Sequence, residues 1–150
     1  MALKEQINND LKAALLGGNH FNVEVLRGLK ATILNEEVAK GKREDGLDDS
    51  VIEQLIVREV KKRNESATIY DGANRPELAS SERSEAQILS AYLPKQLTES
   101  EINVVVTRII NGLGVTSSSV MGQVIGAVKK ELGNTADGAT IAKLVKSALN

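Results

Sequence analysis

The chain has 150 residues, of which 41% are hydrophobic and only three are aromatic, and its formal net charge is −1. The absence of cysteine and the single histidine exclude disulfides, thiol nucleophiles, cysteine-ligated zinc and any site that requires two histidines. The near-zero charge excludes a strongly basic nucleic-acid-binding domain, so an RNA contact would have to come from a local patch.

Hydrophobic residues in the first half recur at spacings of three and four without sustained alternation, which predicts helices. The first helix is expected over residues 3–16, where the sequence GGNH breaks it. The second is expected over 21–40, before the charged loop GKREDG. Ser50 and Glu53 have the spacing of a capping box, in which a hydroxyl and a carboxylate satisfy free backbone amides. They predict that a third helix begins at this point and continues to about Tyr70.

A fourth helix is expected over residues 76–93, because Pro76 suits a first helical turn and Pro94 disfavours helical geometry at the residue before it. Each of the four predicted helices has one apolar stripe, which we expect to form a shared core. The expected inward-facing residues are Leu3, Ile7, Leu11, Ala14, Leu15, Val25, Leu26, Leu29, Ile33, Leu34, Val38, Ile52, Leu55, Ile56, Val60, Leu78, Ala86, Leu89 and Leu93.

A second capping box follows Pro94, formed by Thr98 and Glu101, with Leu97 and Ile102 at the hydrophobic-staple positions. This pattern predicts a domain boundary here. The predicted fold is all-α, with a four-helix N-terminal subdomain over residues 1–96 and a three-helix C-terminal subdomain over residues 97–150.

The three C-terminal helices are expected over residues 98–111, 118–132 and 137–149. Gly133 lies just past the second of them, where a left-handed cap favours glycine. Asp137 is suited to cap the third. The intervening sequence GNTADG is not a phosphate-binding P-loop, because that motif requires a Gly-Lys-Ser/Thr sequence.

Gly122 and Gly126 are four residues apart and therefore share one helix face. We expect this face to pack closely against another helix of the C-terminal subdomain. The alternative is a surface that a backbone or a phosphate group approaches.

Two groups of basic residues are candidate phosphate contacts. The first lies on one face of the third helix, extended by Arg27 and Lys30 on the second, and its alternative role is a solvated face balanced by Glu59 and Glu65. The second gives residues 97–150 five basic against four acidic residues. The candidates are Arg58, Lys61 and Lys62 in the first group and Lys129, Lys130, Lys143 and Lys146 in the second.

The three serines at 117–119 invite comparison with a nucleophilic site, but a serine nucleophile needs a base. This region has no histidine, and no Ser-x-x-Lys spacing starts here. We interpret these serines as helix-capping hydroxyls.

The sequence resembles the YqeY-like family along essentially its whole length. The resemblance is carried by REVKKRNESATIYDGANRPELASSERSEAQILSAYLPKQLTESEI at residues 58–102 and by MGQVIGAVKKELGNTADGATIAKLVKSAL at residues 121–149. The sequence VLRGLKATILNEEVAKG also fits the second helix of the family. The same fold forms the C-terminal tail of the B subunit of the glutamine-dependent aspartyl/glutamyl-tRNA amidotransferase.

This resemblance implies an all-helical fold and an association with glutamine-dependent carbon–nitrogen ligase activity. In the amidotransferase, the tail helps to hold the tRNA while other domains perform the chemistry. Those catalytic parts, with their nucleotide and metal sites, have no counterpart in these 150 residues. The resemblance therefore implies a stand-alone tRNA-binding module without catalytic residues, cofactor or metal of its own, and with no DNA partner.

The family motifs also single out individual positions. Most of them are expected to shape the fold, and the two tyrosines are expected to be partly buried with hydroxyls that need a hydrogen-bond partner. These positions are Lys62, Arg63, Tyr70, Arg75, Tyr92, Pro94, Met121, Gly122, Lys130, Asp137 and Gly138.

Two other functions stay open at this point. One is a protein–protein adaptor for a translation enzyme or an amidotransferase, which would use an apolar groove between the subdomains. The other is an independent amide-transferring or hydrolytic enzyme, which would require a nucleophile–base pair or a metal site. Residues 1–13 are charged and amphipathic, and no apolar run approaches the ~20 residues that cross a bilayer, so we expect no signal peptide, no membrane partner and a cytoplasmic location.

Overall fold

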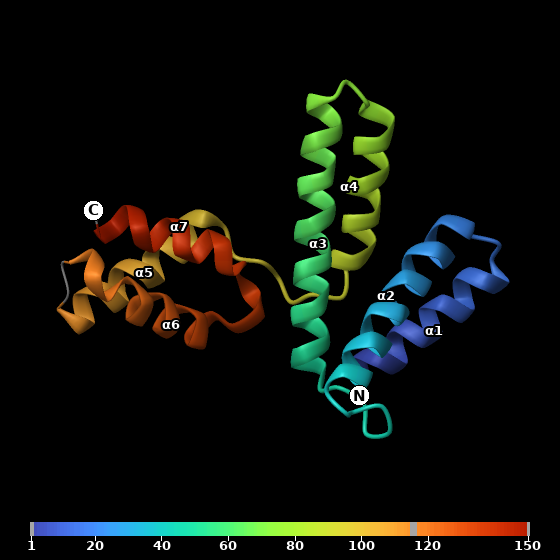
Figure 1. Ribbon diagram of the computed structural model, residues 1–150, viewed down its shortest axis with the longest axis horizontal. Helices are drawn as coiled ribbons and strands as arrows, with labels where there is room; N and C mark the ends of the chain where they lie inside the picture. The colour runs from blue at the N-terminus through green and yellow to red at the C-terminus, as the bar shows by residue number, and fades with distance from the viewer. Residues whose placement is uncertain (1, 115–116, 150) are drawn as a thin grey trace. The chain divides into compact units, whose positions relative to one another are not determined.

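The computed structural model describes residues 2–114 and 117–149, which form α-helices, two short 3-10 helices and no strand (Figure 1). The predicted all-α class is confirmed. Within these residues no single helix is long and apolar enough to cross a membrane, although Glu99–Leu113 and Ser118–Thr135 together match the length and composition as a pair bent by 106°. The elements are α1 (Ala2–Leu16), α2 (His20–Ala39), α3 (Asp49–Gly72), α4 (Pro76–Ser90), α5 (Glu99–Leu113), η1 (Ser118–Val120), α6 (Met121–Leu132), η2 (Gly133–Thr135) and α7 (Gly138–Leu149).

The chain divides into two units, an N-terminal unit, Met1–Leu93, and a C-terminal unit, Pro94–Asn150. The division into subdomains over residues 1–96 and 97–150 stays a prediction. In the N-terminal unit, α1 packs on α2, and α4 packs along the C-terminal part of the longer α3 (Figure 1). The C-terminal unit consists of α5, α6 and α7, each of which packs against the other two.

The helix boundaries differ from the predicted ones where several residues compete for a cap. Asp48 occupies the N-cap position of α3, so Ser50 lies inside the first turn and the predicted Ser50 cap is wrong. The predicted Thr98–Glu101 capping box is confirmed, because both of its reciprocal hydrogen bonds form. Helix α4 ends at Ser90, and residues 91–93 form a turn before Pro94.

The core of the N-terminal unit is aliphatic. Most of the predicted inward positions are buried, but Leu15, Leu34, Val38 and Leu78 are 49%, 45%, 58% and 39% exposed. On α2 the inward stripe runs through Leu26, Leu29 and Ile33 and reaches Glu37 instead of Val38, at spacings of three and four. The buried core residues are Leu3, Ile7, Leu11, Ala14, Val23, Val25, Leu26, Leu29, Ile33, Leu47, Ile52, Leu55, Ile56 and Leu89.

The C-terminal unit has its own aliphatic core, contributed by one face of each of its helices. Two hydrogen bonds tie its first residues to the turn between α6 and α7. The Leu97 amide donates to the Thr135 carbonyl at 2.8 Å, and the Gln96 side chain donates to the Asn134 carbonyl at 2.9 Å. The buried residues are Ile102, Val106, Val124, Val128, Ala136, Ile141, Leu144, Val145 and Leu149.

Candidate functional site

The four C-terminal candidate lysines are all exposed, on α6 and α7. Lys129 and Lys130 lie in the last turn of α6, and Lys146 lies in the last turn of α7. Lys143 Nζ is 2.9 Å from Glu99 Oε1, so its charge is partly compensated. Across residues 2–114 and 117–149, Lys129, Lys130 and Lys146 form no ion pair. Three of the four lysines are therefore available to an anionic partner.

Lys129 extends towards the start of α7. A Cβ added to Gly138 would lie 3.2 Å from Lys129 Cε and 3.3 Å from its Nζ, so the lysine passes directly over this glycine. Asp137 caps α7 as predicted, because its Oδ2 accepts from both the amide and the hydroxyl of Thr140 at 3.1 Å. The C-terminal end of α6 and the first turn of α7 thus lie close together, and they bring the positive charge of Lys129 and the negative charge of Asp137 to one region of the C-terminal unit.

Gly122 and Gly126 do not mediate helix packing, and this prediction is wrong. Both glycines are exposed, and a Cβ at either position would meet no atom within 4 Å. The core of the unit is reached instead by Val124 and Val128, on the opposite side of α6. The two glycines leave a strip of helix backbone uncovered, and helical spacing places Lys129 and Lys130 on the same side. We call this strip the glycine face of α6.

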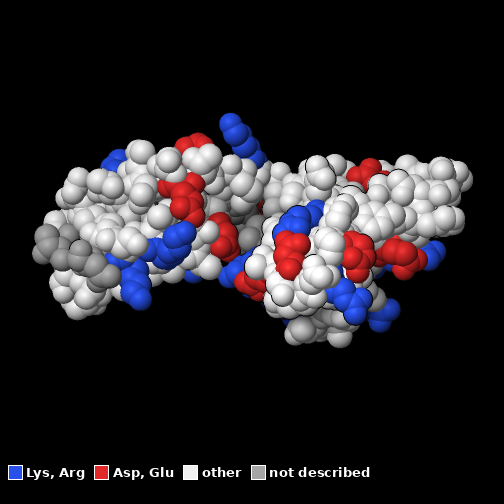
Figure 2. Space-filling model, turned by 90° about the horizontal axis from the view of Figure 1, so that it is seen from above, with Lys and Arg blue, Asp and Glu red and all other residues white. Residues whose placement is uncertain are grey.

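The charge of the C-terminal unit is weakly positive. It contains six lysine or arginine residues against four aspartate or glutamate residues. Two ion pairs, Arg108 with Glu131 and Lys143 with Glu99, each join one basic to one acidic residue, so the excess of two positive charges remains on the other side chains. On the face seen in Figure 2, basic and acidic side chains are interspersed rather than gathered into one basic patch. Any anion contact here depends on a few local lysines.

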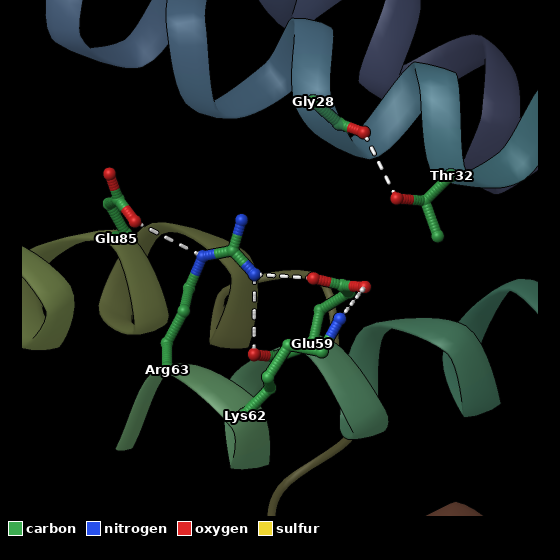
Figure 3. Close-up of polar contacts among 6 residues, drawn as sticks. All are labelled: Gly28, Thr32, Glu59, Lys62, Arg63 and Glu85. Atoms are coloured by element: carbon green, nitrogen blue, oxygen red, sulfur yellow. Dashed lines mark hydrogen bonds and ion pairs between the residues drawn. The ribbon is translucent and has the colours of Figure 1, made fainter. Parts of the chain in front are cut away.

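The candidate group on α3 lies beside a more strongly paired arginine, Arg63, and only one of its own three members is paired among residues 2–114 and 117–149. Lys62 Nζ is 3.8 Å from Glu59 Oε1, and Arg63 donates to both Glu59 Oε2 at 2.5 Å and Glu85 Oε2 at 3.2 Å. Figure 3 shows Arg63 held between these two carboxylates, which come from α3 and α4. Arg63 therefore joins two helices. Arg58 and Lys61 are exposed and form no ion pair with any residue that the structure describes.

The tyrosines of the family motif differ in their surroundings. The Tyr92 hydroxyl donates to Asp10 Oδ2 at 2.6 Å and so ties the end of α4 to α1. Burial, together with this negative acceptor, raises the pKa of Tyr92 far above its ordinary value. The Tyr70 side chain is partly buried, and its carbonyl accepts from the Arg75 amide at 2.8 Å in the turn between α3 and α4. Arg75 itself is exposed at the N-cap of α4.

The motifs around Pro94 and Asp137 meet in space, which their separation in sequence does not reveal. Pro94 is partly buried, and its carbonyl accepts from the Gln96 side chain at 2.9 Å. The same amide group donates to Asn134, in the turn before Asp137. These hydrogen bonds fix the geometry of the turn and therefore have a structural role.

The serine run at 117–119 lies at the start of η1. Ser117 accepts from the Ser119 amide at 3.2 Å and caps η1, as the capping interpretation predicted. Within residues 2–114 and 117–149, no three His, Asp or Glu side chains are placed to hold a metal ion.

One buried charge was missed from the sequence. Glu37 is 1% exposed, and its two carboxylate oxygens lie 2.9 and 2.8 Å from Lys4 Nζ. Next to this pair, Asn8 Oδ1 is buried without a hydrogen-bond partner. The spacing of four residues between Ile33 and Glu37 was the signal in the sequence that Glu37 faces inward. The sequence does not show its partner, because Lys4 comes from another helix.

Comparison with known proteins identifies one family and several relatives of similar sequence. The model of the Yqey-like protein family matches residues 4–149. "Altered inheritance of mitochondria protein 41, mitochondrial" of Lachancea thermotolerans is 29% identical over 83% of this chain and 65% of its own length. The protein of the same name from Pyrenophora tritici-repentis is 27% identical over 96% of this chain and 79% of its own length. The chain thus spans just under two thirds of the Lachancea relative.

These comparisons correct one prediction. Both relatives, and a third from Clavispora lusitaniae that is 24% identical over 87% of this chain and 74% of its own length, are named as mitochondrial proteins. The cytoplasmic location expected from the sequence is therefore contradicted. The amphipathic character of residues 1–13 was not a sound basis for it.

Proposed function

Because the chain belongs to the Yqey-like protein family, we propose that it is a tRNA-binding module that contacts the RNA backbone through its C-terminal unit. The names of its relatives mention no RNA, so the support comes from the resemblance to the amidotransferase tail and from the surface of α6 and α7. In this proposal any glutamine-dependent amidation of the tRNA is carried out by another protein, and this chain supplies binding only.

The observation that carries the proposal is the combination of three unpaired lysines with the glycine face. Exposed lysines without an internal partner lose little when they bind a phosphate, because they break no ion pair. A helix face without side chains allows a sugar–phosphate backbone to come close to the lysines in the next turn. Backbone contacts of this kind position a nucleic acid without reading its sequence.

The residue composition limits the mode of binding. The C-terminal unit contains no aromatic residue, so it has no platform on which an unpaired base could stack. Its charge excess is small. We therefore expect modest affinity, strong dependence on salt and little base specificity.

The test is fluorescence anisotropy of labelled, unacylated tRNA titrated with the protein at about 50 and about 200 mM salt, a range over which several phosphate contacts weaken markedly. One triple variant replaces Lys129, Lys130 and Lys146 with Glu. The matched variant replaces the α3 group, Arg58, Lys61 and Lys62, with Glu and so changes the net charge equally. Duplex DNA serves as the competitor of different shape.

The proposal expects saturable binding that prefers tRNA to DNA and weakens at the higher salt. The α6–α7 variant should abolish this binding, and single Lys→Glu variants at the same positions should each lower the slope of log affinity against log salt by about one. Equal losses in both triple variants would indicate a general charge effect and overturn the assignment to the C-terminal unit. An absence of binding by the wild-type chain at the lower salt would overturn the proposal as a whole.

A protein–protein adaptor is the second candidate, and a separate observation favours it. Leu34 and Val38 are 45% and 58% exposed at neighbouring positions on the outer side of α2. Large contiguous apolar patches mark docking sites for other proteins, and these two side chains would contribute to such a patch. Co-elution with a purified glutamine-dependent amidotransferase that is abolished in Leu34→Glu, together with no tRNA binding by the wild-type chain, would favour this candidate over the RNA module.

A further inference from the structure

A cavity of about 290 Å³ lies between α1 and α2, within the N-terminal unit. Its apolar wall is formed by Ile7, Ile33 and Leu34. Ile7 and Ile33 belong to the core, while Leu34 is 45% exposed and lies at the rim. This volume is at the lower end of the range for small-molecule sites, and mixed apolar and polar lining is typical of them.

The charged groups of the cavity leave one positive charge uncompensated. Lys4 and Lys30 contribute two ammonium groups, and Glu37 contributes one carboxylate. Both oxygens of Glu37 accept from Lys4 at 2.8 and 2.9 Å, so this carboxylate is already satisfied. Lys30 forms no ion pair with any residue that the structure describes. The cavity therefore favours a ligand with a single negative charge.

Asn8 adds a second requirement. It lines the cavity, and its Oδ1 is buried without a hydrogen-bond partner. Buried polar atoms are nearly always paired in folded proteins, so an exception calls for an explanation. Turning this amide towards the cavity would break no hydrogen bond of Oδ1. A ligand that carries an N–H or O–H group would give the oxygen the donor that it lacks.

We propose that the α1–α2 cavity binds a small carboxylic acid with an apolar body and one hydrogen-bond donor on that body. Lys30 pairs with the ligand carboxylate, and the third N–H of Lys4 adds a hydrogen bond. Ile7, Ile33 and Leu34 cover the apolar body, and Asn8 accepts from the donor. This site is independent of the RNA surface and does not require the tRNA proposal to hold.

The chain is well suited to a direct test because it contains no tryptophan. Indole-3-acetate combines an apolar ring, one N–H and one carboxylate, and its indole emission can be followed without interference from the protein. Two matched compounds remove one feature each: 1-methylindole-3-acetate lacks the N–H donor, and indole-3-acetamide lacks the charge. The titration uses the full chain and extends to about 10 mM, because ligands of this size bind preformed sites in the millimolar range or tighter.

The expected result is saturable binding of indole-3-acetate that weakens at least about tenfold in each matched compound. Lys30→Met should weaken binding by at least about tenfold, whereas Lys12→Met, which removes another exposed lysine of the same helical pair, should leave it unchanged. In Asn8→Leu, the methylated and unmethylated compounds should bind equally. The comparison of the two compounds on the wild-type chain does not depend on the folding of any variant.

Three outcomes would overturn the proposal. The first is a lack of saturation by indole-3-acetate up to about 10 mM. The second is equal binding of the methylated and unmethylated compounds to the wild-type chain, which would assign Asn8 no part in binding. The third is an equal loss in Lys30→Met and Lys12→Met, which would reduce the effect to net charge.

Discussion

The buried ion pair between Lys4 and Glu37 allows a quantitative prediction. Glu37 is 1% exposed, and Lys4 is its partner for both oxygens. Replacing Lys4 with Met would leave a carboxylate buried without a counter-charge, which typically costs about 3–5 kcal/mol. The Lys4 side chain is 35% exposed, so solvent already screens part of the interaction. We expect Lys4→Met to destabilise the N-terminal unit by about 2–3 kcal/mol.

Both tyrosines of the chain lie in the N-terminal unit, and the chain has no tryptophan, so tyrosine fluorescence follows the unfolding of this unit alone. With a urea dependence of about 1 kcal/mol per M for a unit of this size, the expected loss corresponds to a midpoint lower by about 2–3 M. The double variant Lys4→Met/Glu37→Met replaces the pair with apolar side chains of similar length. It should recover to within about 1 kcal/mol of the wild type.

The control is Lys40→Met, which removes the partner of Glu36 from a surface pair at 3.1 Å. Lys40 is 49% exposed, so this loss should not exceed about 0.5 kcal/mol. A midpoint shift in Lys4→Met no larger than the shift in Lys40→Met would refute the reasoning. So would a double variant as unstable as Lys4→Met alone, because the cost would then not arise from the unpaired carboxylate.

Three other substitutions probe the glycine face, the Tyr92 hydroxyl and the Arg63 ion pairs. Gly126→Ala should stabilise the C-terminal unit by about 0.5–1 kcal/mol in calorimetry, because no atom lies near the added methyl group, and it should weaken tRNA binding. The control is Gly28→Ala on α2, where the added methyl group is equally free of contacts. It should stabilise the N-terminal unit without affecting tRNA binding. Tyr92→Phe should cost about 1–2 kcal/mol at neutral pH, measured by urea denaturation with circular dichroism. Because the pKa of Tyr92 is raised on folding, the wild type should lose stability as pH rises above about 10, and the variant should lose less. Arg63→Met should destabilise the N-terminal unit by about 1–2 kcal/mol in the same assay, because it leaves Glu85 without its partner and Glu59 with only the 3.8 Å contact to Lys62. Lys62→Met, whose side chain is 74% exposed, should have almost no effect.

The helical architecture could be predicted because its signals are local. Spacings of three and four mark each helix, and the reciprocal hydrogen bonds of Thr98 and Glu101 require only residues three apart. The start of α3 shows the limit of this approach. Asp48, Asp49 and Ser50 are all good N-cap residues, so their identity does not decide among them. The Asp49 side chain accepts from the Leu3 amide, a hydrogen bond across 46 residues that no local pattern contains.

The inward face of α2 shows why burial was harder to predict than helix position. Hydrophobicity alone favours Leu34 and Val38 over Glu37, yet Glu37 is buried and the other two are exposed. The outcome depends on Lys4 of another helix, because a carboxylate is buried only where a counter-charge meets it. The cavity between α1 and α2 follows from the same arrangement and was equally invisible in the sequence.

For the glycine face of α6, the sequence predicted helix packing, and only the structure shows that its glycines are exposed. A glycine in the interior of a helix costs about 0.5–1 kcal/mol relative to alanine. Close packing against another helix would offset this loss of stability. However, no atom lies within 4 Å of a Cβ added at Gly122 or Gly126. Natural sequences break local rules mainly where function requires it. Packing within the described residues therefore does not account for Gly122 and Gly126, and a role of the uncovered backbone beside Lys129 and Lys130 in binding stays a proposal.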